Sequence, residues 1–213
     1  MPGIKENVAQ DQRVIAKAGG AREYIVAVGL PKGLIYQKDN EETTGVIRIG
    51  GHLVDSLTPM TYAVWTQCLT PMVANAYAVQ WLSSVLGRYP QACRSALDKL
   101  FAAGYLVRPQ LGSRLSREIS DLRPIPSGYG AGNSFVTPDK YYVSMESNTP
   151  VALDVIGQAL WSLMDGNLTL QEIAEEATKW LEIVPELVEA GLIYTVVELM
   201  SGRCLYLDRA VSS

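Results

Sequence analysis

The sequence holds few of the side chains that build metal sites and active sites. It has one histidine, His52, and three cysteines, Cys68, Cys93 and Cys204, among 213 residues. No two of these four lie at the short CxxC or HxxxH spacing of a structural zinc site, so we expect no metal and no cofactor. Three scattered cysteines also argue against a disulfide framework and favour the reducing cytoplasm.

Targeting and membrane-spanning segments are lacking as well. Residues 1–20 are polar, carry early acidic side chains and contain no apolar run, so they do not resemble a secretory signal. No segment reaches the roughly 18 uninterrupted apolar residues that a spanning helix needs. We therefore expect a cytoplasmic, soluble protein without membrane contact, in which residues 1–20 form a flexible arm.

No catalytic pattern stands out among the nucleophiles and acids. A nucleophile would need Cys68 or a serine beside His52, and no elbow or triad context surrounds either residue. The glycine-rich residues 128–132 follow no apolar strand and open no helix, so the context of a nucleotide-binding loop is missing. The sequence therefore predicts that the protein is not an enzyme.

Charge is unevenly distributed along the chain. The 18 basic and 22 acidic residues give a net charge of -4. Residues 88–123 hold seven basic and three acidic side chains, a net charge of +4, whereas residues 148–190 hold one basic and eight acidic side chains, a net charge of -7. Because phosphate attraction dominates nucleic-acid affinity, DNA could bind only to the first of these regions.

The first half reads as strands followed by three helices. Residues 24–28 and 34–36 are β-branched and aromatic runs on either side of the turn-forming residues 30–33, which predicts a β-hairpin. Thr58-Pro59 is a helix-start signal, with a capping hydroxyl before a proline at the first helical position. Further helices are predicted over residues 74–86 and 90–103, and a strand after Gly104.

A similar order returns after residues 108–140, which are rich in proline and glycine and are predicted to be a linker. The second set of signals consists of a strand at 141–143, a helix start at Thr149-Pro150, a capping box at Thr169 and Glu172, a helix from Pro185 and a strand at 204–207. Each half therefore places three helices before a closing strand.

The two halves also match residue by residue at one offset. The matched set is Thr58, Pro59, Val64, Gln67 and Leu69 with Thr149, Pro150, Val155, Gln158 and Leu160, and Gly104 and Gly202 share a terminator role. Three helices followed by a β-wing is the winged-helix arrangement. The predicted fold class is α+β, mainly helical, with tandem winged helix-turn-helix units at 21–107 and 141–213 and an N-terminal β-hairpin.

Residues 159–177, ALWSLMDGNLTLQEIAEEA, carry a family resemblance. An apolar helix, Asp-Gly and a Thr-x-x-Glu-Ile capped helix resemble the small winged-helix modules called RiPP recognition elements, including the pyrroloquinoline quinone biosynthesis chaperone. The similarity covers residues 140–208, with residues 46–107 as a degenerate copy. It implies a recognition protein that binds a peptide or partner protein and presents a precursor peptide to a modifying enzyme.

In that family the peptide adds as a strand beside the third helix, so that backbone pairing supplies affinity. The resemblance therefore implies a peptide-binding groove formed by one strand and one helix. Its residues would be Tyr141, Tyr142 and Val143 on the strand and Glu189, Ile193 and Val196 on the helix.

The alternative is a DNA-binding winged-helix regulator that uses the first unit, with a homodimer as one possible form. The third helix of that unit would enter the major groove. Its DNA contacts would come from the basic side chains Arg88, Arg94, Lys99, Arg108, Arg114 and Arg117. The acidic second unit would repel DNA.

Overall fold

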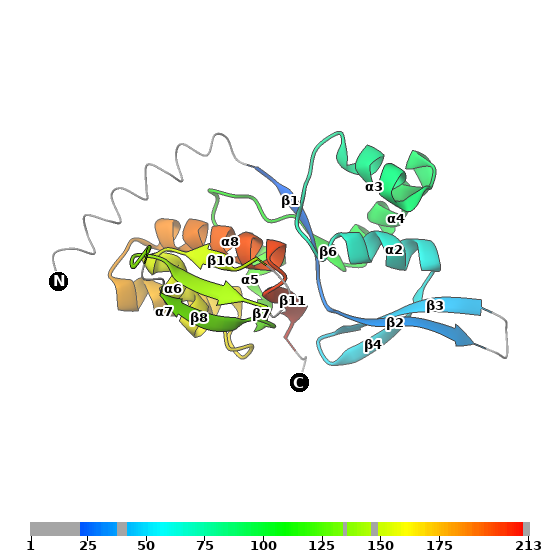
Figure 1. Ribbon diagram of the computed structural model, residues 1–213. Helices are drawn as coiled ribbons and strands as arrows, with labels where there is room; N and C mark the ends of the chain where they lie inside the picture. Colours follow the sequence, from blue (N-terminus) through cyan, green and yellow to red (C-terminus); the bar gives the residue numbers. More distant parts are fainter. Residues whose placement is uncertain (1–21, 38–41, 134–135, 146–148, 211–213) are drawn as a thin grey trace.

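The computed structural model describes residues 22–37, 42–133, 136–145 and 149–210. It confirms an α+β fold with small antiparallel sheets. Figure 1 shows two halves side by side, one built from the segments up to β6 and one from the later segments. The predicted arm at residues 1–20 lies outside the described residues.

Strand β1 (Tyr24–Ala27) is the central strand of a small sheet, between β5 (Met72–Val73) and β6 (Leu106–Val107). The predicted hairpin of residues 24–28 with 34–36 is therefore wrong. The chain turns at Gly29, whose φ of +100° suits glycine, and runs on into a separate sheet. The residues expected to form a tight turn lie inside a strand, at a bulge between Pro31 and Gly33.

This separate sheet is a three-stranded meander of β2 (Leu30–Gln37), β3 (Glu42–Ile49) and β4 (His52–Leu57). One of its faces packs against α2 (Pro59–Gln67), where Tyr62 approaches the backbone of Gly45. A Cβ atom at position 45 would lie 2.3 Å from the Cβ of Tyr62, so only glycine fits there.

The helices of the first half are α2, α3 (Ala78–Leu86) and α4 (Pro90–Ala102). The predicted start of α2 is confirmed, because the hydroxyl of Thr58 accepts a hydrogen bond from the amide of Thr61 at 3.2 Å and Pro59 is the first helical residue. α3 begins four residues later than predicted. The residues after Pro71 pair with β1 as β5 instead of entering the helix.

The second half begins inside the predicted linker. Residues 108–140 contain α5 (Arg117–Ser120), β7 (Leu122–Pro126) and β8 (Tyr129–Asn133). β8 continues into a second meander with β9 (Tyr141–Ser144) and β10 (Val151–Leu153). Apolar side chains in this stretch anchor it, since Ile119 and Leu122 are fully buried.

Three helices and a strand complete this half: α6 (Val155–Leu163), α7 (Leu170–Leu181), α8 (Pro185–Ser201) and β11 (Leu205–Arg209). The predicted helix start at Thr149 is wrong, because the next residues form β10. The cap is Asp154, whose carboxylate accepts from the amide of Gly157 at 2.7 Å. The capping box of Thr169 and Glu172 is confirmed.

Both halves follow one order of elements. Each has a strand, a three-stranded meander, three helices and a last strand that pairs antiparallel with the first, β1 with β6 and β7 with β11. The additions to this order are β5, between α2 and α3 of the first half, and α5, before β7 of the second. The residues that cap the first helix of each half are Thr58 and Asp154. The residue-by-residue match predicted from the sequence pairs Thr58 with Thr149 instead, so it is out of register with the structure. The left-handed residue after the third helix is Gly104 in one half and Arg203 in the other.

The halves share one continuous hydrophobic core. Their backbones meet where the amide of Gly29 donates to the carbonyl of Leu207 at 2.7 Å. Nearby, the guanidinium of Arg209 donates to the carbonyl of Gly104 at 2.9 Å. These contacts join β11 of the second half to the sheet and helix end of the first.

Candidate functional site

The predicted peptide groove is not open in the structure. β9, which carries Tyr141, Tyr142 and Val143, is the central strand of its sheet and pairs with β8 on one side and β10 on the other. A peptide can add only to a strand with a free edge. Strand addition at β9 is therefore excluded by its two existing partners.

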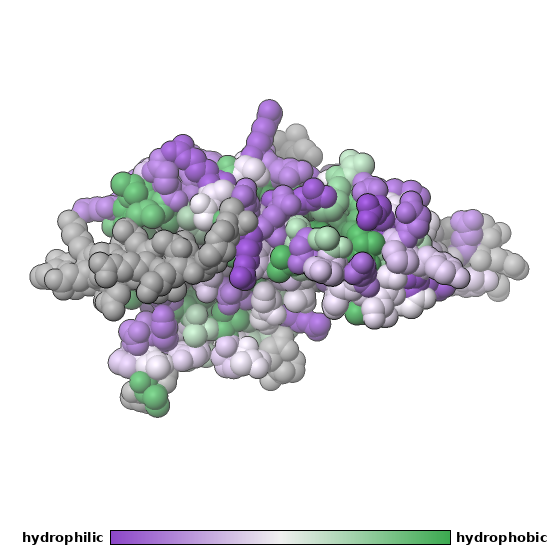
Figure 2. Space-filling view, turned by 90° about the horizontal axis from the view of Figure 1, so that it is seen from above, coloured by the Kyte–Doolittle hydropathy of each residue, from purple (hydrophilic) through white to green (hydrophobic). Residues whose placement is uncertain are grey.

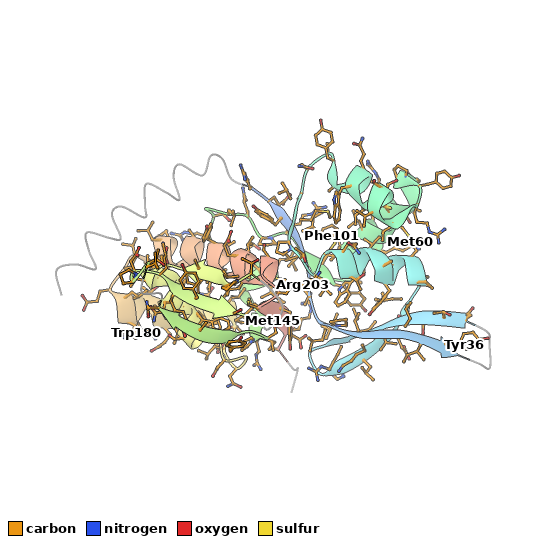
Figure 3. The ribbon with its side chains drawn as sticks, in the orientation of Figure 1. Tyr36, Met60, Phe101, Met145, Trp180 and Arg203 are labelled. Carbon is orange, nitrogen blue, oxygen red and sulfur yellow. The ribbon has the colours of Figure 1, made fainter. Side chains whose placement is uncertain are left out.

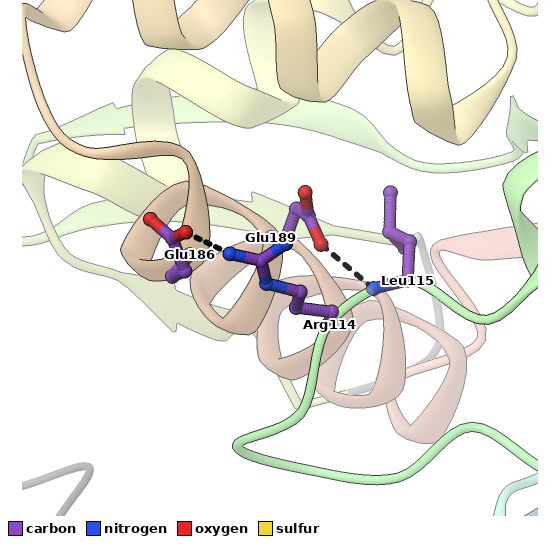
Figure 4. Close-up of polar contacts among 4 residues, drawn as sticks. All are labelled: Arg114, Leu115, Glu186 and Glu189. Carbon is purple, nitrogen blue, oxygen red and sulfur yellow. Dashed lines mark hydrogen bonds and ion pairs between the residues drawn. The ribbon is translucent and has the colours of Figure 1, made fainter.

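The helix side of that groove is covered as well. Ile193 and Val196 are buried in the core, with 2% and 3% of their surface exposed. The carboxylate of Glu189 accepts a hydrogen bond from the amide of Leu115 at 2.9 Å, and Arg114 forms an ion pair with Glu186 (Figure 4). The segment before α5 thus lies along α8 where a peptide was predicted.

The six predicted DNA-contacting residues lie on several elements and differ in their contacts. Arg88, Arg94 and Lys99 are exposed at or near α4, and Arg117 is exposed on α5. The guanidinium of Arg108 lies 4.2 Å from the ring centre of Phe101, a cation–π contact. Arg114 is engaged by Glu186.

Arg108 and Arg114 do share a cleft between the halves. Its volume is about 760 Å³, and it lies beside Phe101, which Figure 3 labels. The lining residues are Glu23, Phe101, Arg108, Gln110, Ser113, Arg114, Leu115, Ser116, Glu118 and Ile119. The lining holds two arginines and two glutamates, so its charges sum to zero and the cleft offers a polyanion no net attraction.

Within the described residues, the nucleophilic and metal-binding side chains do not gather into a cluster. All three cysteines are buried and free, and burial raises the pKa of the Cys68 thiol to about 12. Among the described residues there is no group of three histidine, cysteine or acidic side chains that could hold a metal. Every helix in the described ranges is too short or too polar to cross a membrane.

The first half exposes large apolar side chains in two places, along β2 and β4 (Leu34, Ile35, Tyr36 and Leu53) and on one face of α3. Tyr77, at the N-cap, and Trp81 and Val85 follow at four-residue spacing, which places them on one side of the helix. Their exposed fractions are 70%, 46% and 51%. We call these three residues the α3 stripe. The opposite side of the helix anchors it in the core through Ala78 and Leu82.

No charged residue lies between Asp55 and Arg88 in the sequence, so α3 has no charged side chain of its own. Figure 2 views this side of the molecule, and hydrophobic and weakly polar residues mix with purple ones over its right-hand half. Periodicity over residues 74–86 predicts one apolar side that holds Leu82 and Val85 together, but the structure buries Leu82 and leaves Val85 exposed. The long gap between charges was the signal for a second apolar face.

Comparisons with known proteins identify no family. No protein-family model and no curated protein matches the chain. Among solved structures it is similar to PKMT2 from Rickettsia typhi in complex with AdoHcy, at 10% identity and a TM-score of 0.35, and to PKMT2 from Rickettsia typhi, at 12% and 0.34. Each match covers 86% of this chain and 42% of the other, so the chain spans less than half the length of those proteins.

The solved structures to which the chain is similar are PKMT2 proteins, one of them in complex with AdoHcy, and not peptide-recognition modules. The predicted non-enzymatic recognition protein and the prediction that the chain is not an enzyme are therefore withdrawn. Neither the peptide-presenting role nor its DNA-binding alternative is carried further. At these identities and TM-scores, the likeness itself assigns no activity to this chain.

Proposed function

We propose that the chain associates with another protein chain through the α3 stripe. The observation that carries the proposal is an aromatic, charge-free helix face that stays exposed in the folded chain. Interface cores are depleted of charged residues and enriched in aromatic ones, and tryptophan and tyrosine are frequent hot spots. The stripe has this composition, with Trp81 at its centre.

The position of α3 supports this role. The helix lies at the upper right of Figure 1, on the side of the first half away from the second half. The side of α3 that faces the core is buried through Ala78 and Leu82. About half or more of the surface of each outer side chain remains exposed, and burial against a partner would remove this apolar surface from water.

A photo-crosslinking amino acid at position 85 tests this function in cells that produce the full chain. Covalent adducts are expected from position 85 and not from position 179, an exposed control site on α7. A second substitution, Trp81→Glu, should remove the adducts. No adduct from position 85, or equal adducts from both positions, would overturn the proposal.

We further propose that each half is a winged-helix-like unit and that the protein is cytoplasmic. The support for the fold is the shared order of three helices and a closing strand, which in each half pairs antiparallel with the strand that begins the half. The support for the compartment is three free cysteines, all buried.

A further inference from the structure

The exposed residues on either side of Trp81 form a near-palindrome in the sequence, and its outer members lie off α3, Val73 in β5 and Tyr89 at the N-cap of α4. Tyr77 and Val85 lie four residues to either side, and Val73 and Tyr89 lie eight residues to either side. Both outer residues are also exposed, at 38% and 85%. At four residues from Trp81, and again at eight, a tyrosine lies on one side and a valine on the other.

This order suits an antiparallel pair of identical helices. In a two-fold arrangement the same patch lies on both copies, so residue i meets residue j and residue j meets residue i. With the axis at Trp81, the two tryptophans meet each other and Tyr77 of each copy meets Val85 of the other. Large and small side chains then alternate across the interface instead of clashing.

The charges fit a two-fold contact as well. A charged residue close to a two-fold axis meets its own copy, and like charges that face each other in an interface are costly. The three residues of the stripe carry no charge, and the nearest charged residue along the chain is the exposed Arg88, seven residues from Trp81.

The exposed area is sufficient for a weak dimer. An aromatic side chain contributes about 150–250 Å² when it is buried. At the exposed fractions of the five residues, two copies would bury on the order of 1,000 Å², near the lower limit of specific interfaces.

From these observations we infer that the partner of the α3 stripe is a second copy of this chain, packed antiparallel across a two-fold axis at Trp81. The inference rests on the proposed function and names its partner. It assigns the centre of the interface to one residue, which allows a test by charge complementation.

Sedimentation velocity of the full chain over a concentration series provides the test. Trp81→Glu and Trp81→Lys should each weaken the dimer by at least about 30-fold, the effect of a hot spot, because each places like charges at the axis. An equal mixture of the two variants should restore the dimer, since glutamate then meets lysine. Restoration also shows that both variants are folded.

Trp180→Glu is the matched control. Trp180 is 62% exposed on α7, at the end of the molecule far from α3 (Figures 1 and 3). This variant should dimerise like the original chain. A dimer that survives Trp81→Glu, or a mixture that stays monomeric, would overturn the two-fold contact.

A disulfide trap gives an independent readout. Trp81→Cys should form a covalent dimer under mild oxidation, because a disulfide needs Cα atoms within about 7 Å of each other. The three native cysteines are buried and do not compete. A Trp180→Cys variant should remain monomeric under the same conditions, and equal trapping of both variants would count against the inference.

The two proposals fail in different ways. If the chain is monomeric at every concentration and the crosslinker at position 85 captures a different protein, the second copy is excluded and the proposed association stands. If position 85 captures nothing, both proposals fail. Adducts at twice the mass of the 23.2 kDa chain support both.

Discussion

The backbone amide of Gly50 donates a hydrogen bond to the buried carboxylate of Asp208, 2.8 Å away and 158 residues further along the chain. The same carboxylate oxygen accepts from the amide of Arg209 at 2.8 Å. One side chain of β11 thereby holds the turn between β3 and β4. The two halves of the molecule are joined here by a polar contact as well as by their common core.

Removing this acceptor should destabilise the whole fold. We expect Asp208→Leu to lower the free energy of unfolding by about 1–3 kcal/mol, because the amide of Gly50 would be left without its partner in a buried position. Asp208→Asn keeps an oxygen at the same place and should cost less. Urea denaturation measures both, and equal losses for the two variants would contradict the assigned role of the hydrogen bond.

Gly191, inside α8, should be replaceable by alanine with a gain in stability. A Cβ atom there would lie 3.5 Å from the nearest side-chain atom of Ile156, an ordinary contact distance. Alanine is favoured over glycine in a helix by about 1 kcal/mol, so Gly191→Ala should raise the free energy of unfolding by up to that amount.

Gly202→Ala is the contrasting variant at the end of the same helix. Its Cβ would lie 2.2 Å from a methyl carbon of Val151 in β10, which forces the strand or the helix end to shift. It should be destabilising by about 1–3 kcal/mol. Thermal unfolding of the two variants side by side should move the midpoint in opposite directions.

The capping box at the start of α7 should make stability depend on acidity. The amide of Thr169 donates to the carboxylate of Glu172, and this hydrogen bond lowers the pKa of that carboxyl below its ordinary value of 4.5. A lowered pKa means that the charged form contributes stability above pH 4.5. That contribution is lost as the pH falls through the lower folded value.

The variant Glu172→Gln should therefore be less stable than the original chain at pH 7, and the difference should shrink once the pH is well below 4.5. Glu175→Gln on the same helix lies outside the box and controls for the loss of one negative charge. Urea midpoints across the pH range provide the measurement. A difference that stays constant down to pH 3 would disprove a charge-dependent cap.

The thiols should be unreactive in the folded protein. Cys68, Cys93 and Cys204 are buried, and burial raises the pKa of each thiol. Because the thiolate is the reactive form, a disulfide reagent at pH 8 should label none of the three within minutes. In denaturant it should label all three, and rapid labelling of the folded chain would show that a cysteine is accessible.

Local signals in the sequence identified the helices well. The hydroxyl of Thr58 before Pro59, the pair Thr169 and Glu172, and the proline at 185 each act within a single turn of helix, so their effect does not depend on the rest of the fold. Thr149-Pro150 shows the limit of such signals. The same dipeptide precedes a strand there, because residues 151–153 pair with β9.

Strand pairing could not be deduced in the same way. The apolar run at residues 24–28 has the composition of a strand, but its partners β5 and β6 come about fifty and eighty residues later in the chain. Likewise, Tyr141 to Val143 were correctly predicted to be a strand, and only the pairing on both sides shows that no peptide can be added there.

The sequence by itself determined where most helices begin, the repeat of three helices before a closing strand, and the scarcity of chemical groups, because these depend on residues close together in the chain. Only the tertiary structure decided which strands pair, that the supposed linker lies along α8, and that Tyr77, Trp81 and Val85 stay outside the core. A helix with apolar residues on two sides carries no local signal for which side is buried. That choice is made by the surfaces that pack against it.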